Sequence, residues 1–254
     1  MRHILVTCAT SHLGQGIIQH LSKQQYPLIL LGRDEMTLKK IQHQAVKNGS
    51  KSVQIQSVNF SEKQSLDLFQ KWLTKNPIDL QGTVIITPRP QLTDNLFPTT
   101  DEWQTMIQDC FVGPLDIIKS SLPFYGHNGK LVVISGISSL QVMPEHAAFG
   151  TLRAMWLAHA KALSHQLGPQ GIHVNTLSPG GILTDYMTSL IQKKAENNKT
   201  DFETQYAQST ANVPLRKYAS VSEIANIVAF FLSEQSDHIT GTNIACDGGF
   251  TKHY

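Results

Sequence analysis

The chain has 254 residues, 41% of them hydrophobic, which is enough to bury one large core. Its formal net charge of +2 is small and its Lys and Arg residues are scattered, so a nucleic-acid-binding surface is not expected. No apolar run approaches the ~20 residues of a membrane-spanning helix, and no leader-like segment precedes the first apolar run. Cys8, Cys110 and Cys246 are far apart and match neither a disulfide framework nor a metal-ligand spacing. We therefore predict a cytoplasmic protein that binds no metal, no nucleic acid and no membrane.

Short apolar runs alternate with amphipathic helical patterns along the chain. The expected strands lie near residues 3–7, 27–32, 53–58, 83–87, 130–135, 172–178 and 242–248. Two long helical patterns run from Trp103 to Leu122 and from about His146 to Leu167. Continuous apolar strands that alternate with helices are typical of a parallel sheet covered on both faces, and right-handed crossovers make such a sheet doubly wound. We predict one α/β domain over residues 1–254, a Rossmann-like doubly wound parallel sheet of about seven strands with helices on both faces.

Residues 188–212 are the least regular part of this pattern. They are polar and include the sequence KKAENNKTD. Irregular surface segments often carry function, which favours a mobile lid. A run of charges is also typical of solvated helices. Both interpretations remain open, and a solvated helix pair is the plainer one.

Two segments in the last hundred residues carry a resemblance to a known family. Residues 171–184 read GIHVNTLSPGGILT, similar to a VNxVxPGxIxT pattern, and residues 213–251 follow a long pattern that ends in ITG and DGG. On these segments the chain resembles the short-chain dehydrogenase/reductases, in particular the 3-oxoacyl-ACP reductases. The resemblance covers essentially the whole chain and implies an oxidoreductase scaffold with a nicotinamide cofactor. It places four residues of the first segment at the nucleotide: Pro179, Gly180, Ile182 and Thr184.

The turn after the first expected strand departs from the TGxxxGxG pattern of that family. It reads TCATSHLG, so that Cys8 and His12 replace two glycines. Glycines stand there in a dinucleotide site because the backbone turns tightly and approaches the pyrophosphate closely. Two outcomes are open: His12 fills the phosphate site, or it reshapes the loop and donates a hydrogen bond to phosphate. The positions expected to contact a nucleotide in this turn are Thr7, Ser11, His12, Leu13 and Gly14.

The next turns also differ from the family. The second expected strand ends in Gly32 and Arg33, where an NAD site carries an acid for the ribose 2′-hydroxyl. A guanidinium suits a 2′-phosphate, so the expected cofactor is NADP(H), with a solvated Arg33 and no cofactor as the alternative. Asn59 and Phe60 replace an Asp and an apolar residue that face adenine in the family. The sequence TPRP replaces Asn-Asn-Ala-Gly and is expected to direct Arg89 toward the cofactor cleft.

The resemblance also identifies where the catalytic residues should be. In active members a Tyr donates a proton to the carbonyl, a Lys lowers the pKa of that Tyr and binds the nicotinamide ribose, a Ser polarises the carbonyl, and an Asn anchors a water. Residue by residue, the Asn, Ser, Tyr and Lys positions are Cys110, Gly136, Phe149 and Arg153. Phe149 has no ionisable group and Gly136 has no hydroxyl. Arg153 stays protonated near neutral pH, although it could still hold ribose hydroxyls or an anion.

Substitute groups are available nearby. His146 lies seven residues before Arg153, so both can share a helix face, and in related enoyl reductases the Tyr stands at that spacing. Imidazole is a good proton donor near neutral pH, and Ser135, Ser138 or Ser139 could polarise a carbonyl. The plainer interpretation is that His146 is a surface residue at the start of a helix.

Three functions follow from these observations. The first is a non-catalytic subunit or small-molecule-binding protein, the second an NADP(H)-dependent ketone or enone reductase that uses substitutes such as His146, and the third a cleft repurposed for isomerisation or cyclisation. We rank them in that order, because fold alone does not determine function. The two long helices have broad apolar faces, and the resemblance places a second interface at the C-terminal strand. These features predict a homo-oligomer, either dimer or tetramer, or a hetero-oligomer with an intact relative. Ordinary core packing explains about half of the apolar faces.

Overall fold

The computed structural model describes residues 2–76, 78–90, 95–143 and 147–252. Its centre is a seven-stranded sheet in the order β3-β2-β1-β4-β5-β6-β7, and every neighbouring pair is parallel. The predicted α/β class and doubly wound sheet are thus confirmed. The strands are β1 His3–Val6, β2 Leu28–Gly32, β3 Val53–Ser57, β4 Leu80–Ile86, β5 Tyr125–Ile134, β6 Ile172–Pro179 and β7 Asn243–Cys246.

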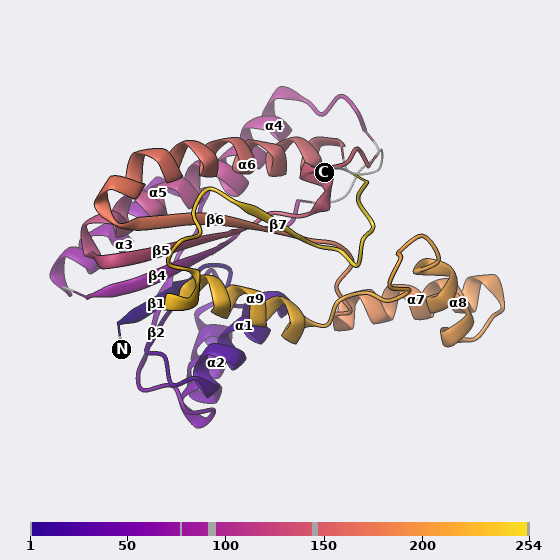
Figure 1. Ribbon diagram of the computed structural model, residues 1–254, viewed down its shortest axis with the longest axis horizontal. Helices are drawn as coiled ribbons and strands as arrows, with labels where there is room; N and C mark the ends of the chain where they lie inside the picture. The colour runs from indigo at the N-terminus through magenta and orange to yellow at the C-terminus, as the bar shows by residue number, and fades with distance from the viewer. Residues whose placement is uncertain (1, 77, 91–94, 144–146, 253–254) are drawn as a thin grey trace.

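Helices cover both faces of the sheet (Figure 1). Helices α3, α4, α5 and α6 lie on one face, and α1, α2 and α9 lie on the other. The helices are α1 His12–Lys23, α2 Glu35–Lys47, α3 Lys63–Lys75, α4 Thr100–Ile107, α5 Gly113–Ser121, α6 Ala147–Leu167, α7 Asp185–Asn198, α8 Phe202–Ser209 and α9 Val221–Leu232.

Two apolar cores follow from the two-residue period of the strands. In β1, Ile4 and Val6 belong to the core beneath α1 and α9, whereas Leu5 belongs to the opposite core. All three are fully buried. Because successive side chains of a strand point to opposite faces, an uninterrupted apolar strand supplies both cores at once. The strand order reverses between β1 and β4, which opens a crevice at the carboxyl ends of these strands.

The region from Trp103 to Leu122 is helical, as the sequence pattern predicts, but it contains a π-helical turn that the pattern does not show. Helix α4 passes into a π-helical turn, η1 Gln108–Val112, before α5 begins. Pro114 has no N–H to donate to the carbonyl of Cys110 four residues earlier. The Cys110 oxygen instead accepts a hydrogen bond of 2.7 Å from Trp156 Nε1 on α6. The proline therefore frees a carbonyl that ties this turn to α6.

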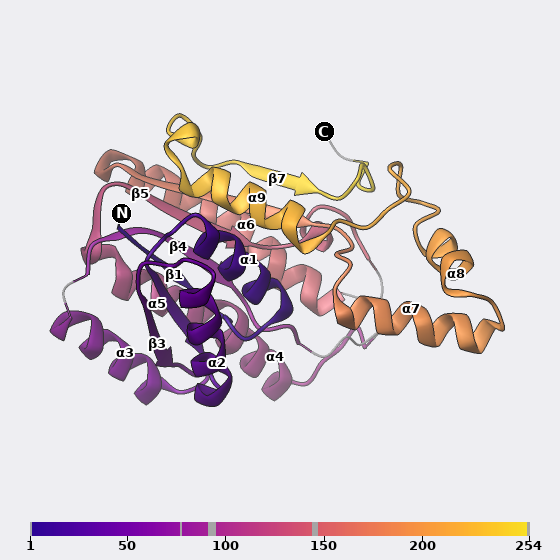
Figure 2. The same ribbon diagram turned by 90° about the horizontal axis from the view of Figure 1, so that it is seen from below.

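Residues 188–212 form a helix pair and not an irregular loop. Helices α7 and α8 project from the body of the protein beyond the sheet (Figure 2). Thr184 caps α7 by accepting a hydrogen bond from Met187 N, and the Phe202 and Tyr206 rings stack at 6.1 Å. Tyr206 Oη also accepts a hydrogen bond from Tyr218 N at 3.0 Å, which joins α8 to the segment before α9. The structure thus matches the solvated helix pair, and motion of the pair stays a prediction.

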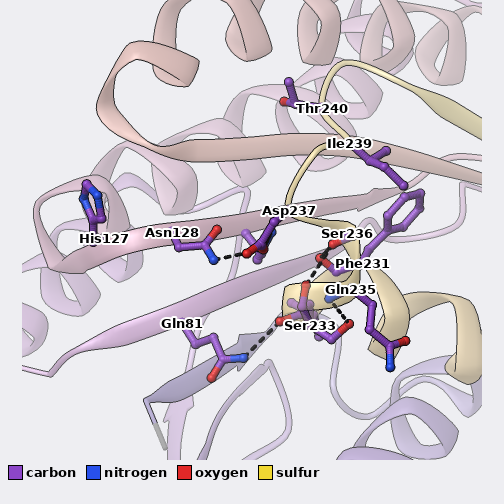
Figure 3. Close-up of polar contacts among 12 residues, drawn as sticks. Gln81, His127, Asn128, Phe231, Ser233, Gln235, Ser236, Asp237, Ile239 and Thr240 are labelled. Atoms are coloured by element: carbon purple, nitrogen blue, oxygen red, sulfur yellow. Dashed lines mark hydrogen bonds and ion pairs between the residues drawn. The ribbon is translucent and has the colours of Figure 1, made fainter.

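A buried lysine joins β5 to the turn after α9, at the end of the sheet opposite the crevice. Lys130 Nζ donates to Asp237 Oδ1 at 2.7 Å, and the exposed fractions of the two side chains are 2% and 48%. Figure 3 shows Asn128 directed at the same carboxylate, to which its Nδ2 donates at 2.9 Å. These hydrogen bonds, that of Lys130 first, lower the pKa of Asp237. The stabilisation is therefore present above the ordinary carboxyl pKa and is lost as the pH falls through the lowered value.

Removing either partner of this pair should have unequal effects. Asp237→Ala leaves a buried ammonium without a counter-ion, and we expect it to lower the free energy of unfolding by about 2–4 kcal/mol. Lys130→Met fills the same space and leaves a half-exposed carboxylate that water solvates, so we expect a loss below about 1.5 kcal/mol. Urea denaturation of both variants measures the difference, and an equal or reversed order would contradict this account.

Candidate functional site

The crevice at the carboxyl ends of β1, β2, β4, β5 and β6 is a cleft of about 830 Å³. Most of the residues predicted to contact a nucleotide line it. From that set the lining includes Ser11, His12, Leu13, Arg33, Asn59, Phe60, Arg153, Pro179, Gly180, Ile182 and Thr184.

Thr7 and Gly14 lie near this cleft but do not line it. Thr7 is fully buried, and its Oγ1 donates to Ile86 O at 2.7 Å and accepts from Ile86 N at 2.8 Å, which ties β1 to β4. Gly14 packs so closely that a Cβ there would lie 2.5 Å from Cys8 O. Both residues therefore support the first turn without facing a ligand.

The first turn has the left-handed backbone conformation that favours glycine, although residue 8 is Cys. Cys8 adopts a left-handed conformation with φ of 45°, which a residue with a Cβ adopts only under strain. Burial raises the pKa of its thiol to about 12, so Cys8 is not a nucleophile. Ser11 caps α1 by accepting a hydrogen bond of 3.0 Å from Gly14 N. His12 Nε2 lies 3.7 Å from Asp185 Oδ2, so its half-exposed imidazole faces the start of α7.

The polar groups of the second and third turns are used differently. Arg33 is exposed at the end of β2 and lines the cleft. Asn59 Nδ2 donates to Glu62 Oε1, and Asn59 Oδ1 accepts from Ser61 N, so its amide is engaged within its own turn. Phe60 is buried and packs against Gly113 at the start of α5, where a Cβ would lie 2.6 Å from Phe60. Of these groups, Arg33 is the one available to a ligand.

Arg153 lines the cleft and contacts residues 136, 138 and 149. Its Cζ lies 3.8 Å from the centroid of the Phe149 ring, and its Nη1 donates to Ser138 Oγ at 3.0 Å. A Cβ added at Gly136 would lie 2.4 Å from Arg153 Cζ. The guanidinium thus occupies the space beside residue 136 that a larger side chain would need. Burial, and then the nearby charge of Arg89, lower the pKa of Arg153 to about 10, so it remains charged at neutral pH.

The other proposed substitutes are engaged in local contacts. Ser135 Oγ donates to Arg153 O at 3.2 Å, and Ser139 Oγ donates to Gly136 O at 2.6 Å. Ser138 accepts from Arg153, as described above. His146 lies outside the described residues, so its part in the site stays a prediction. These hydroxyls position Arg153 and its neighbours.

Cys110 lies on the π-helical turn and does not line the cleft. Its thiol is buried and donates to Pro88 O at 3.4 Å. Burial raises the pKa of this thiol to about 12. Cys110 therefore offers the cleft neither an amide nor a thiolate.

Several lining residues were not singled out by the sequence patterns. They are Met143, Tyr186, Met187, Tyr218, Asp247 and Phe250. The Tyr186 ring centroid lies 5.7 Å from Arg89 Cζ, which places the predicted cleft-facing Arg89 beside it. Tyr186 and Met187 follow Thr184 directly in the first turn of α7, so the resemblance around Thr184 was the signal that could have found them.

Comparisons with known proteins agree with this geometry. The family model for enoyl-(acyl carrier protein) reductase matches residues 8–251. The chain belongs to the short-chain dehydrogenase/reductase family.

Relatives in this family match the chain over nearly full length. The NADPH-dependent reductase BacG of Bacillus subtilis is 26% identical over 258 residues, which covers 99% of this chain and 98% of BacG. The 3-oxoacyl-[acyl-carrier-protein] reductase FabG of Aquifex aeolicus is 27% identical over 251 residues, which covers 96% of this chain and 95% of FabG. The structure of L-sorbose reductase from Gluconobacter frateurii, complexed with NADPH and L-sorbose, shares the fold with a TM-score of 0.92 at 18% identity, covering 100% of this chain and 97% of that one.

Two further properties of this family member come from the described residues. None of their helices combines the length and apolar character needed to cross a membrane. Within the same ranges, no group of three or more His, Cys, Asp or Glu side chains could hold a metal ion.

The close approach of Arg153 to Gly136 can be tested by a double-mutant cycle. We expect Gly136→Ala to lower the free energy of unfolding by about 1–3 kcal/mol, because the new methyl group displaces the guanidinium from Phe149 and Ser138. In an Arg153→Ala background the same change should have little effect. Urea denaturation of the four proteins measures the coupling.

Gly168→Ala is the matched control for this cycle. A Cβ at Gly168 would meet no atom within 4 Å, so we expect a change within about 0.5 kcal/mol in either background. An equal loss from Gly136→Ala with and without Arg153 would show that the guanidinium is not the obstacle.

Proposed function

We propose that this chain is a non-catalytic member of the short-chain dehydrogenase/reductase family, a ligand-binding or regulatory subunit that does not carry out standard carbonyl reduction. The observation that supports this most is the Arg153 guanidinium, stacked on Phe149 and filling the space at Gly136. Active members keep a phenol and a hydroxyl at the Phe149 and Gly136 positions. A benzene ring donates no proton at any pH, and a guanidinium that stays charged at neutral pH does not relay one.

We propose NADP(H), and not NAD(H), for any nucleotide that this cleft binds. The left-handed turn at Cys8 and the capped start of α1 fit a pyrophosphate, and Arg33 fits a 2′-phosphate. NADPH-dependent relatives support the same choice. The cofactor would supply a hydride, whereas the residues at the four catalytic positions supply no proton to accompany it. A subunit that binds no nucleotide is the alternative within this proposal.

The chain is also proposed to form an oligomer, either a dimer or tetramer of itself or a hetero-oligomer with an intact relative. On the long helices Ile117, Ile118 and Trp156 are buried in the core, so part of the apolar face is accounted for within one chain. Met106 and Leu115 are only half-buried. Leu115 packs against the core, whereas Val112 is 38% exposed. The cytoplasmic location stays a prediction.

A reductase with a substitute proton donor is the second candidate function. Tyr186 is a phenol in the cleft wall, 49% exposed, with the Arg89 guanidinium 5.7 Å from its ring. A phenol hydroxyl can donate a hydrogen bond or a proton to a carbonyl oxygen. His146, outside the described residues, is the other candidate donor.

A turnover assay separates these two functions. With purified protein we expect no oxidation of NADPH in the presence of ketones or enones, measured by the loss of absorbance at the nicotinamide band. The variant Cys110→Asn, Gly136→Ser, Phe149→Tyr, Arg153→Lys restores the four family groups, and we expect it to gain measurable activity. Turnover by the unmodified chain, free of contaminating relatives, would contradict the proposed function. Its loss in Tyr186→Phe or His146→Ala would then identify the donor.

A further inference from the structure

We propose that Arg153 and Arg89 form a binding site for the carboxylate of a small organic acid, whose apolar body lies in the cleft. This inference deepens the proposed function and rests on it, because it assigns a ligand class to the cleft in which relatives transfer a proton. The residues that carry it are the two guanidinium groups and the apolar wall around them.

Arg153 is held in place but is not neutralised. Phe149 supports one face of the guanidinium and Ser138 accepts one hydrogen bond from Nη1. A guanidinium has five N–H donors. Within the described part of the chain, Ser138 Oγ is the one acceptor within hydrogen-bonding distance, and no carboxylate lies within ion-pair distance of Arg153. The remaining donors are therefore available to a planar anion.

Arg89 brings a second positive charge to the same cleft. It stands between Pro88 and Pro90, which restrict the backbone, and its guanidinium lies against the Tyr186 ring. Burial of Arg153 is the main cause of its lowered pKa, and the positive charge of Arg89 lowers that pKa further. A bound anion would offset the repulsion between these two positive charges.

The carboxylates of the cleft wall are engaged elsewhere. Asp109 accepts a hydrogen bond from the Ser61 hydroxyl. Asp247 accepts from Gly249 N and Thr251 N at 2.9 Å each, and from Thr251 Oγ1 at 2.6 Å. Among the described residues of the wall, neither acid serves as counter-ion to the arginines. Within the described residues, the two guanidinium groups are therefore left without a protein carboxylate as counter-ion.

The wall favours a carboxylate over a phosphate. Phe149 stacks on Arg153, and the cleft lining also includes Ile137, Met143, Met187 and Phe250. A carboxylate is planar, carries one charge and matches the fork of an Arg side chain. A phosphate has further oxygens that need donors, which an apolar wall does not supply. The geometry therefore selects an acid with an aliphatic or aromatic body.

The test compares each acid with its uncharged amide. Phenylacetate and cinnamate, with phenylacetamide and cinnamamide as matched probes, are titrated into the purified chain at neutral pH and low salt, and binding is followed by calorimetry. We expect each acid to bind at least ~10-fold more tightly than its amide, since the hydrogen bonds of the site are charge-assisted. Arg153→Met and Arg89→Met should each reduce this ratio, and Arg153→Lys should retain part of it because it keeps the charge without the fork.

Arg216→Met is the matched control, because Arg216 is exposed and does not line the cleft, so the ratio should be unchanged. Circular dichroism melts establish that each variant is folded, and the exposed Arg89 provides the decisive variant if Arg153→Met is not. Equal binding of acid and amide, no binding of either acid, or an unchanged ratio in Arg89→Met would overturn the proposal. The titrations contain no NADPH, so the binding is independent of turnover: NADPH oxidation with a ketone or enone in the separate assay would contradict the proposed function and leave this inference standing.

Discussion

The stacking of Arg153 on Phe149 is the interaction on which the rest of the cleft depends. The guanidinium reaches across to Ser138 and takes the volume beside Gly136, so that residues 136, 138, 149 and 153 form one packed unit. In a close-packed site such changes are linked, because a larger side chain at one position requires a smaller one at its neighbour. The glycine at position 136 and the arginine at position 153 therefore fit each other as parts of one packed arrangement.

The stacked Arg153 and Phe149 favour anion binding in the cleft over proton transfer. A lysine beside a tyrosine promotes proton transfer, whereas an arginine on a benzene ring retains its own proton and presents hydrogen-bond donors. With Arg89 close by, the part of the cleft around Arg153 carries two guanidinium groups, and Arg33 adds a third elsewhere in the lining. Binding and orientation of an anionic ligand are the tasks that such an arrangement performs well. The scaffold is that of an oxidoreductase, and the proposed role is recognition.

The sequence predicted the sheet well because each strand is an uninterrupted apolar run that fills two cores. Its prediction of a helix from Trp103 to Leu122 missed the π-helical turn within that helix, although Pro114 was visible in the sequence. Pro114 has no N–H for the Cys110 carbonyl, and the helix forms a π-helical turn there. Trp156 Nε1, far along the chain, donates the hydrogen bond to Cys110 O instead. A partner 46 residues away cannot be read from local pattern. The N-terminal extension of β5 to Tyr125 was missed for a similar reason, since the polar HNGK segment shows no strand pattern.

The sequence by itself determined the fold class and the family resemblance, because these depend on apolar periodicity and on motifs that are continuous in the chain. The placement of Cys110, Gly136, Phe149 and Arg153 at the catalytic positions stays a prediction from that resemblance. Only the tertiary structure decided that Arg153 lies in the space beside Gly136 and that Ser135 and Ser138 form hydrogen bonds with Arg153. It also decided that His12 faces Asp185 and that Thr7 is buried next to the sheet. These contacts join residues from different strands and helices, and the direction of a side chain is set by packing between elements and not by its neighbours in sequence.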